Sequence, residues 1–203
     1  MATRVNVTEV NFLNNPSKLT DGFKLEITFE VSEDLPGDLE WELVYVGSPE
    51  TEAEDQILDT AVIESIRAGR HKFVFEADGP DVTKLPKEFI VGVTVLLLHC
   101  KYNNKNFMKI GYFVANEYTD EELINEPPVE PIIEKVVRSV KTDDLRVHFN
   151  MINWDDETTT PDVEMEDKEE QKNIGLAHGG VDDGSSCIAD RVASLVVSPI
   201  SEM

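Results

Sequence analysis

Apolar and polar side chains alternate over short stretches through most of the first 155 residues. Because successive side chains of a β-strand point to opposite faces, this period of two predicts strands that bury one face. A Pro-Gly turn at residues 36–37 joins the clearest such stretch, residues 23–31, to its predicted hairpin partner, residues 39–46. In the first of these strands the apolar positions are Phe23, Leu25, Ile27, Phe29 and Val31.

Similar patterns bounded by turn residues predict further strands. Two short helices are also predicted, one capped by Thr119 with Glu122 three residues later, the other within residues 132–140. A helical turn is expected in the acidic loop 47–55. Seven or eight antiparallel strands without a long helix predict an all-β fold, an antiparallel β-sandwich. The further strands cover residues 5–13, 57–63, 70–77, 91–100, 107–114 and 145–154.

The stretch 91–100, VGVTVLLLHC, is apolar on both of its faces. Val93, Val95 and Leu97 share one face, and we call them the apolar stripe; Leu96 and Leu98 share the other. A parallel strand buried on both faces would need helical crossovers, which the flanking segments lack. Either the stripe is covered by this chain's own residues, or it is an exposed docking site for another protein.

The charge of the chain is strongly negative, with 41 acidic and 18 basic side chains and a formal net charge of −23. Such a field repels nucleic acid and favours basic partners. The alternative is that the acidic side chains serve only the solubility of the protein. Residues 155–203 contain 13 acidic and three basic side chains and few apolar ones. We therefore predict a folded core over residues 1–156 and a disordered acidic tail over residues 157–203. Residues 193–197 of the tail, ASLVV, are an apolar exception and a candidate binding segment.

Several kinds of chemistry leave no trace in the sequence. Phosphate-binding glycine loops, zinc-protease pairs, nucleophile elbows and calcium loops are absent, and the four histidines have no spacing for a metal. A hydrolase built on a sandwich would need paired titratable groups in a pocket. No apolar run suits a membrane span or a secretory signal, so we expect a soluble intracellular protein with Cys100 and Cys187 reduced. The sequence predicts a binding protein without cofactor, not an enzyme.

Several stretches together resemble the anti-silencing-function family of histone H3–H4 chaperones. The resemblance implies an elongated immunoglobulin-like sandwich that acts as a monomer in the nucleus, with a cytoplasmic pool during histone import. It implies that the chain binds a histone H3–H4 dimer, blocks the surface by which two dimers form a tetramer, and passes the dimer to deposition factors for nucleosome assembly and disassembly. The matching stretches are FKLEITFEVSEDL (23–35), DLEWELVYVGS (38–48), DQILD (55–59), AGRHKFVFEAD (68–78), VGVTVLLLHCKY (91–102), IGYFVANEYTDEEL (110–123), NEPPVEP (125–131) and INWDDE (152–157).

The resemblance also implies three binding surfaces. Histone H3 would contact an apolar and acidic set: Val46, Glu50, Asp55, Val93, Thr94, Val95, Leu97, Lys109 and Tyr112. The C-terminal segment of histone H4 would add as a strand beside Leu145, Arg146 and Val147, with Phe113 and Glu117 nearby. Other deposition chaperones carrying a basic motif would contact Asp38 over an apolar floor of Phe29, Ile63 and Phe73.

Three positions depart from the family pattern. Lys109 stands where arginine is usual, so a two-pronged ion pair is lost there. Glu130 stands where lysine is usual, and Gly37 replaces an acidic neighbour of Asp38, which would weaken that third contact. The competing interpretation from the residues alone is an acidic scaffold whose apolar stripe binds a partner other than a histone.

Overall fold

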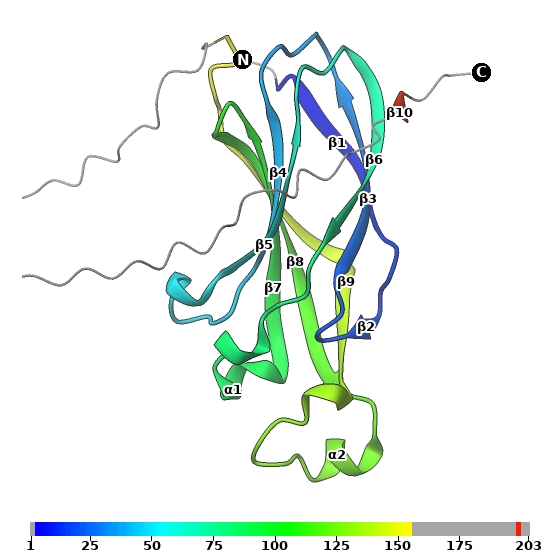
Figure 1. Cartoon of the computed structure of the whole chain (residues 1–203), viewed down its shortest axis with the longest axis vertical. Helices are drawn as coiled ribbons and strands as arrows, with labels where there is room; N and C mark the ends of the chain where they lie inside the picture. Colours follow the sequence, from blue (N-terminus) through cyan, green and yellow to red (C-terminus); the bar gives the residue numbers. More distant parts are fainter. Residues whose placement is uncertain (1–2, 156–197, 200–203) are drawn as a thin grey trace, which may run out of the picture.

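Two antiparallel sheets pack face to face in the computed structural model, which describes residues 3–155 and 198–199 (Figure 1). The first sheet has the order β1 (Val5–Phe12), β3 (Phe23–Val31), β6 (Gly69–Ala77) and β10 (Ser198–Pro199). The second has the order β2 (Ser17–Lys18), β9 (Val136–Phe149), β8 (Lys105–Tyr118), β7 (Gly92–Tyr102), β4 (Leu39–Tyr45) and β5 (Gln56–Ile63). The predicted all-β sandwich is confirmed.

Helices are short and lie in the loops. They are α1 (Lys87–Ile90), α2 (Glu121–Asn125) and three turns of 3-10 helix over Glu52–Glu54, Val82–Lys84 and Ile133–Lys135. The helical turn expected in the acidic loop is therefore present. Helix α2 exists as predicted, but its N-cap is Asp120, whose carboxylate accepts the Glu122 N–H at 3.1 Å, and not Thr119.

The second predicted helix, over residues 132–140, is wrong. One 3-10 turn is followed from Val136 by strand β9, which pairs with β8 in continuous register from Tyr118↔Val136 to Phe113↔Lys141. Apolar residues at 133, 136 and 140 fit a helical face, yet Val136 and Val140 also fit the strand period and are 0% and 4% exposed. Pairing with β8 decides between the two patterns. The same strand ends at Phe149, short of the predicted residue 154.

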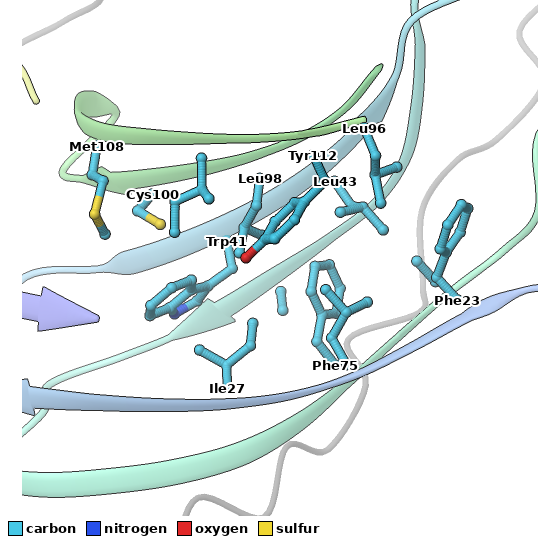
Figure 2. Packing of buried hydrophobic residues seen from close by; sticks show 14 of the residues in the cluster. Phe23, Ile27, Trp41, Leu43, Phe75, Leu96, Leu98, Cys100, Met108 and Tyr112 are labelled. Atoms are coloured by element: carbon cyan, nitrogen blue, oxygen red, sulfur yellow. The ribbon is translucent and has the colours of Figure 1, made fainter. Parts of the chain in front are cut away.

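The core lies between the sheets and is rich in aromatic rings (Figure 2). Trp41 from the second sheet meets Phe29 and Phe73 from the first, with ring centroids 5.1 and 5.4 Å apart. Leu96, Leu98 and Cys100 from β7 point into this core and are 0% exposed. Each large apolar side chain buried there contributes about 1.5–3 kcal/mol.

Arg138 is a buried cation that the residue pattern does not predict. Its guanidinium donates to the carbonyls of Leu19, Asp21 and Gly22 and to the Ser17 hydroxyl, at 2.7–3.3 Å. It also lies 3.5 Å from the ring centre of Phe23. Burial lowers the pKa of Arg138 to about 10, against the opposing effects of Tyr45 and Asp21. The arginine therefore fastens the loop around β2 to strand β9.

Candidate functional site

Strand β7 has one buried face and one open face. Its core-facing side chains are fully buried, whereas Val93 is 71% exposed and Val95 and Leu97 are partly exposed. Within the described residues, nothing covers the apolar stripe completely. Of the two alternatives left open by the sequence, the exposed stripe is the one that the structure has. We call this side of the second sheet the open face.

Neighbouring strands extend the stripe into a shallow apolar surface. Phe113 of β8 pairs with Val95, Gly111 pairs with Leu97, and all four lie on the open face. A Cβ atom placed on Gly111 would stand 3.5 Å from Leu97 Cδ2 and 3.8 Å from Val95 Cγ1. The glycine therefore leaves a hollow of about 180 Å³, which Arg146 and His148 of β9 also line.

Tyr112 was expected on this surface, and the structure contradicts that placement. It pairs with Leu96, and its side chain points into the core (Figure 2), where it is 2% exposed. Its ring meets that of Phe12 edge-on, with centroids 5.1 Å apart. Burial raises the pKa of its hydroxyl well above the usual range. The aromatic ring on the open face belongs to Phe113, which had been assigned to the strand-edge contact. Adjacent residues of a strand point to opposite faces of the sheet. An assignment that is wrong by one position therefore exchanges the core residue with the residue of the open face.

Val46 and Thr94 close the end of the stripe near the acidic loop. The Thr94 hydroxyl donates to the Val46 carbonyl at 2.6 Å, and the Val46 N–H donates to the Val95 carbonyl at 3.0 Å. These bonds continue the pairing of β4 with β7 beyond Tyr45. Thr94 therefore positions the surface and Val46 contributes apolar area to it, because Val46 is partly exposed.

An acidic rim lies beside this end. Glu50 is exposed and Asp55 is partly buried at the start of β5. Burial raises the pKa of Asp55, while a hydrogen bond from the Gly47 backbone and the nearby charge of Lys109 oppose that effect. Asp55 Oδ1 is shielded from solvent and accepts no hydrogen bond from the described residues. The site thus offers an acceptor without a hydrogen bond from the described residues, and the positive charge of Lys109 on β8 acts on it.

Beyond Leu97, the open face becomes a charged network. His99 Nδ1 lies 2.9 Å from Glu42, and Lys101 Nζ lies 2.8 and 2.9 Å from Glu42 and Glu40. Burial lowers the pKa of His99, and Glu42 only partly offsets this. Burial works against the charge of Glu42, but hydrogen bonds from Lys101 and His99 outweigh it and hold the pKa of Glu42 below its usual value. Sequence reasoning missed this network, although the residues alternate visibly in both strands.

The second half of β9 forms a free edge. Strand β2 pairs only with Val137 and Arg138, and no described strand flanks β9 beyond them. From residue 141 onward every side chain of β9 is exposed. Leu145, Val147 and Phe149 form one row, 42%, 42% and 56% exposed, while Arg146 points to the open face. Phe149 also lines an apolar hollow of about 300 Å³ with Phe107, Met151, Ile152 and Trp154. Glu117, placed near this contact by the resemblance, is exposed on β8 opposite Val137.

The floor expected for a third partner is not exposed. Phe29, Ile63 and Phe73 are 0%, 8% and 2% exposed and belong to the core. Asp38 is exposed as expected, and its backbone N–H donates to the Asn103 side chain at 3.1 Å. A Cβ on Gly37 would clash with that same side chain. The glycine thus allows Asn103 to pack over this turn. Glu130 forms an exposed ion pair with Lys87 at 2.7 Å.

Comparison with known proteins identifies the family of the chain. A sequence profile described as ASF1 like histone chaperone matches residues 2–155. The chain belongs to the ASF1-like histone chaperone family. It is 56% identical over 172 residues to a probable histone chaperone asf-1-like protein of Caenorhabditis elegans, covering 85% of this chain and 69% of that protein.

Two further relatives extend the comparison. The chain is 59% identical over 157 residues to the probable histone chaperone asf-1 of the same nematode, with 77% of this chain and 57% of the relative covered. It is 46% identical over 152 residues to histone chaperone asf1 of Drosophila melanogaster, with 75% and 70% covered. The matched part of this chain therefore spans between 57% and 70% of the length of these relatives.

The family to which the chain belongs is one of histone chaperones, a non-enzymatic kind of binding protein with a chromatin-related role. The described residues contain no group of acidic, histidine or cysteine side chains that would hold a metal ion. None of their helices has the length and apolar character of a membrane span. Cys100 is free and buried in the core, and burial raises the pKa of its thiol.

Proposed function

We propose that the open face of the second sheet binds histone H3 within a histone H3–H4 dimer and thereby blocks the surface by which two dimers pair. One observation carries the proposal: a row of apolar side chains, centred on Val95, stands open to solvent in a member of a histone chaperone family. Fully burying a valine or leucine contributes about 1.5–3 kcal/mol, so the stripe and Phe113 together supply most of the affinity.

The acidic rim adds orientation. Asp55 offers an unmet acceptor to a basic histone side chain, Lys109 faces an acidic one, and Glu50 strengthens the negative potential. Exposed ion pairs contribute only about 0–1 kcal/mol each. Their main effect is therefore on the rate and orientation of encounter with a basic partner, while the stripe sets the affinity.

The free edge of β9 provides the second contact. An extended segment, the C-terminal part of histone H4, adds beside residues 145–149 and covers the exposed row of Leu145, Val147 and Phe149. The hollow that Phe149 shares with Trp154 then accepts an apolar side chain at the end of the added strand. Two separated contacts on one histone dimer make the combined binding tighter than either alone.

Transfer to deposition factors requires a further surface. Asp38 is the exposed anchor for a basic motif of such a partner, and the buried Phe29, Ile63 and Phe73 support that surface from within. The chain acts in the nucleus, with a cytoplasmic pool that receives newly made histones, and works as a monomer in nucleosome assembly and disassembly.

The mass of the complex tests the proposal. Purified chain and histone H3–H4 are mixed at moderate salt and separated by gel filtration with light scattering. One chain per H3–H4 dimer, with no histone tetramer in the complex, is expected. Two chains on an intact tetramer would show that the pairing surface is not blocked. Failure to bind histones at all would favour the alternative, an acidic scaffold with a different partner on the same stripe.

A further inference from the structure

The outer edge of the first sheet is occupied by a segment from the far end of the chain. Strand β10 pairs antiparallel with β6, placing Ser198 opposite Lys72 and Pro199 opposite His71. Figure 1 shows this short strand beside β6, at the opposite end of the colour scale from β1. More than 120 residues separate the two partners in sequence, so this pairing is not a local hairpin.

Strand β6 is the most regular of the edges that the described core presents. It pairs with β3 over nine residues, from Phe23↔Ala77 to Val31↔Gly69, without a shift of register. The edge strands β1, β5 and β9 each carry a register shift against their inner neighbours. Bulges protect an edge from further pairing, whereas a regular edge is a template for another strand. β6 therefore needs an occupant more than the others do.

The sequence around β10 suits that role. Residues 193–197, ASLVV, are the apolar exception in an acidic tail, and valine favours a strand. Pro199 cannot donate a backbone hydrogen bond, so it ends the pairing and blunts the newly formed edge. On the receiving side, Arg67 and Arg70 are exposed and Lys72 is paired with Glu26 at 2.9 Å.

We propose that the outer edge of β6 is a strand-addition site, and that the chain's own segment around Ser198–Pro199 occupies it in the free protein. Covalent attachment holds the segment at an effective concentration on the order of millimolar. A pairing with a dissociation constant of about 1 mM, far too weak to capture a separate molecule, is then half formed. An extended segment from another protein gains this edge only by displacing the chain's own segment.

Amide chemical shifts of residues 69–73 in the full chain test the site. The variant Leu195→Gly/Val196→Gly/Val197→Gly removes the apolar residues that precede β10 in the sequence, so these amides should shift towards the values of an unpaired edge. The matched control, Ile174→Gly/Leu176→Gly/Val181→Gly, makes the same kind of change elsewhere in the tail and leaves them unmoved. Unchanged shifts in the first variant, or equal changes in both, would overturn the proposal.

A peptide separates pairing from indirect effects. Residues 190–201, added in trans at millimolar concentration to the first variant, should return the shifts of residues 69–73 towards those of the unaltered chain. In the unaltered chain, the same peptide should change the amide shifts of residues 69–73 at least about twofold less. The reason is that the chain's own segment already fills the edge in half of the molecules, so only the other half can bind the peptide. Equal responses in the two proteins would show that the segment does not occupy the edge. Neither result depends on histone binding.

Discussion

Val95 lies at the centre of the apolar stripe, beside the hollow above Gly111 and opposite Phe113. Its position carries the proposed contact with histone H3, yet its side chain is only partly buried by this chain. Binding and folding therefore make separate demands on this residue. A charged side chain there reaches solvent in the free protein but becomes an unpaired charge once a partner covers the open face.

Val95→Arg should weaken histone H3–H4 binding by at least about 100-fold, because apolar contact is lost and a charge is buried in its place. The melting temperature should change little. Isothermal calorimetry gives the affinity and thermal unfolding the stability. Val74→Arg is the matched control, since Val74 is 37% exposed on the outer side of the first sheet. Histone binding by folded Val95→Arg at the unaltered affinity would remove the stripe from the site.

Arg138, in contrast to Val95, is a charged residue that stabilises the fold and has no part in the proposed binding surfaces. Arg138→Met should lower the free energy of unfolding by about 3 kcal/mol or more, because three carbonyls and one hydroxyl lose their buried donor. Urea unfolding measures this loss. Arg146→Met on the same strand removes a side chain that is 74% exposed and should cost little. Equal stabilities of the two variants would mean that the network around Arg138 contributes nothing net.

His99 should make stability depend on pH. Because burial lowers its pKa in the folded state, the unfolded chain takes up a proton more readily once the pH falls below the ordinary value of about 6.5. Protonation then favours unfolding, and the contribution that is complete above that pH is lost as the pH falls. His99→Gln removes this dependence. Urea unfolding between about pH 8 and pH 5.5 should show the two stability curves diverging on the acid side; parallel curves would contradict the assignment.

At the level of elements, the free half of β9 is the second part of the proposed site. Val147→Asp places a charge in the row that an added histone H4 segment would cover, so the affinity should fall by about tenfold while histone H3 still binds. Fluorescence anisotropy with labelled histone H3–H4 measures the loss. Val74→Asp is the control on the other sheet. The experiment is repeated with histone H3–H4 that lacks the C-terminal segment of histone H4. If Val147→Asp and the unaltered chain then bind with equal affinity, Val147 contacts that segment. An unchanged difference in affinity would argue against the contact.

The elements also show what the residue pattern could and could not predict. Residues 23–31 were predicted from strict alternation, and strand β3 has those bounds; its apolar face is buried, and the other face is exposed at Lys24 and Glu30 but buried at Thr28. Residues 132–140 were misassigned because their apolar spacing suits a helix and a strand equally, and only pairing with β8 separates the two. The side chains of Tyr112 and Phe113 were assigned to the wrong faces of β8 for a related reason. Alternation divides the side chains of this strand into two rows, but it does not tell which row faces the core.

Other features of the structure could not be predicted from the local sequence pattern, because they depend on contacts between residues that are far apart in the sequence. The stripe was predicted as one of two alternatives, and its exposure depends on where the first sheet lies. Arg138 finds its partners in residues 17–22, more than 110 positions away. The buried state of Phe29, Ile63 and Phe73 likewise follows from packing between sheets. The predicted disorder of residues 157–203 falls, apart from Ser198 and Pro199, outside the described residues.

For the whole molecule, net charge should govern the rate of encounter with histones. Raising the salt from about 50 mM to about 500 mM should lower the association rate constant by tenfold or more, because the Debye length falls from about 14 to about 4 Å. The dissociation rate should change much less, since the apolar stripe controls it. Stopped-flow measurement separates the association rate from the dissociation rate.

Deleting residues 158–203 should reduce the salt dependence of the association rate and leave the stoichiometry of the complex unchanged. Loss of all histone binding on deletion would show that the tail is part of the site.

Strand β9 changes character half-way along, with alternating burial up to Val140 and full exposure from Lys141. Its first half is constrained by the interior of the molecule, where a wrong residue weakens the fold. Its second half is held in place by backbone pairing with β8, and its side chains are exposed at the surface and lie outside the buried core. A substitution in this second half therefore alters what the surface can bind while leaving the interior of the molecule as it is.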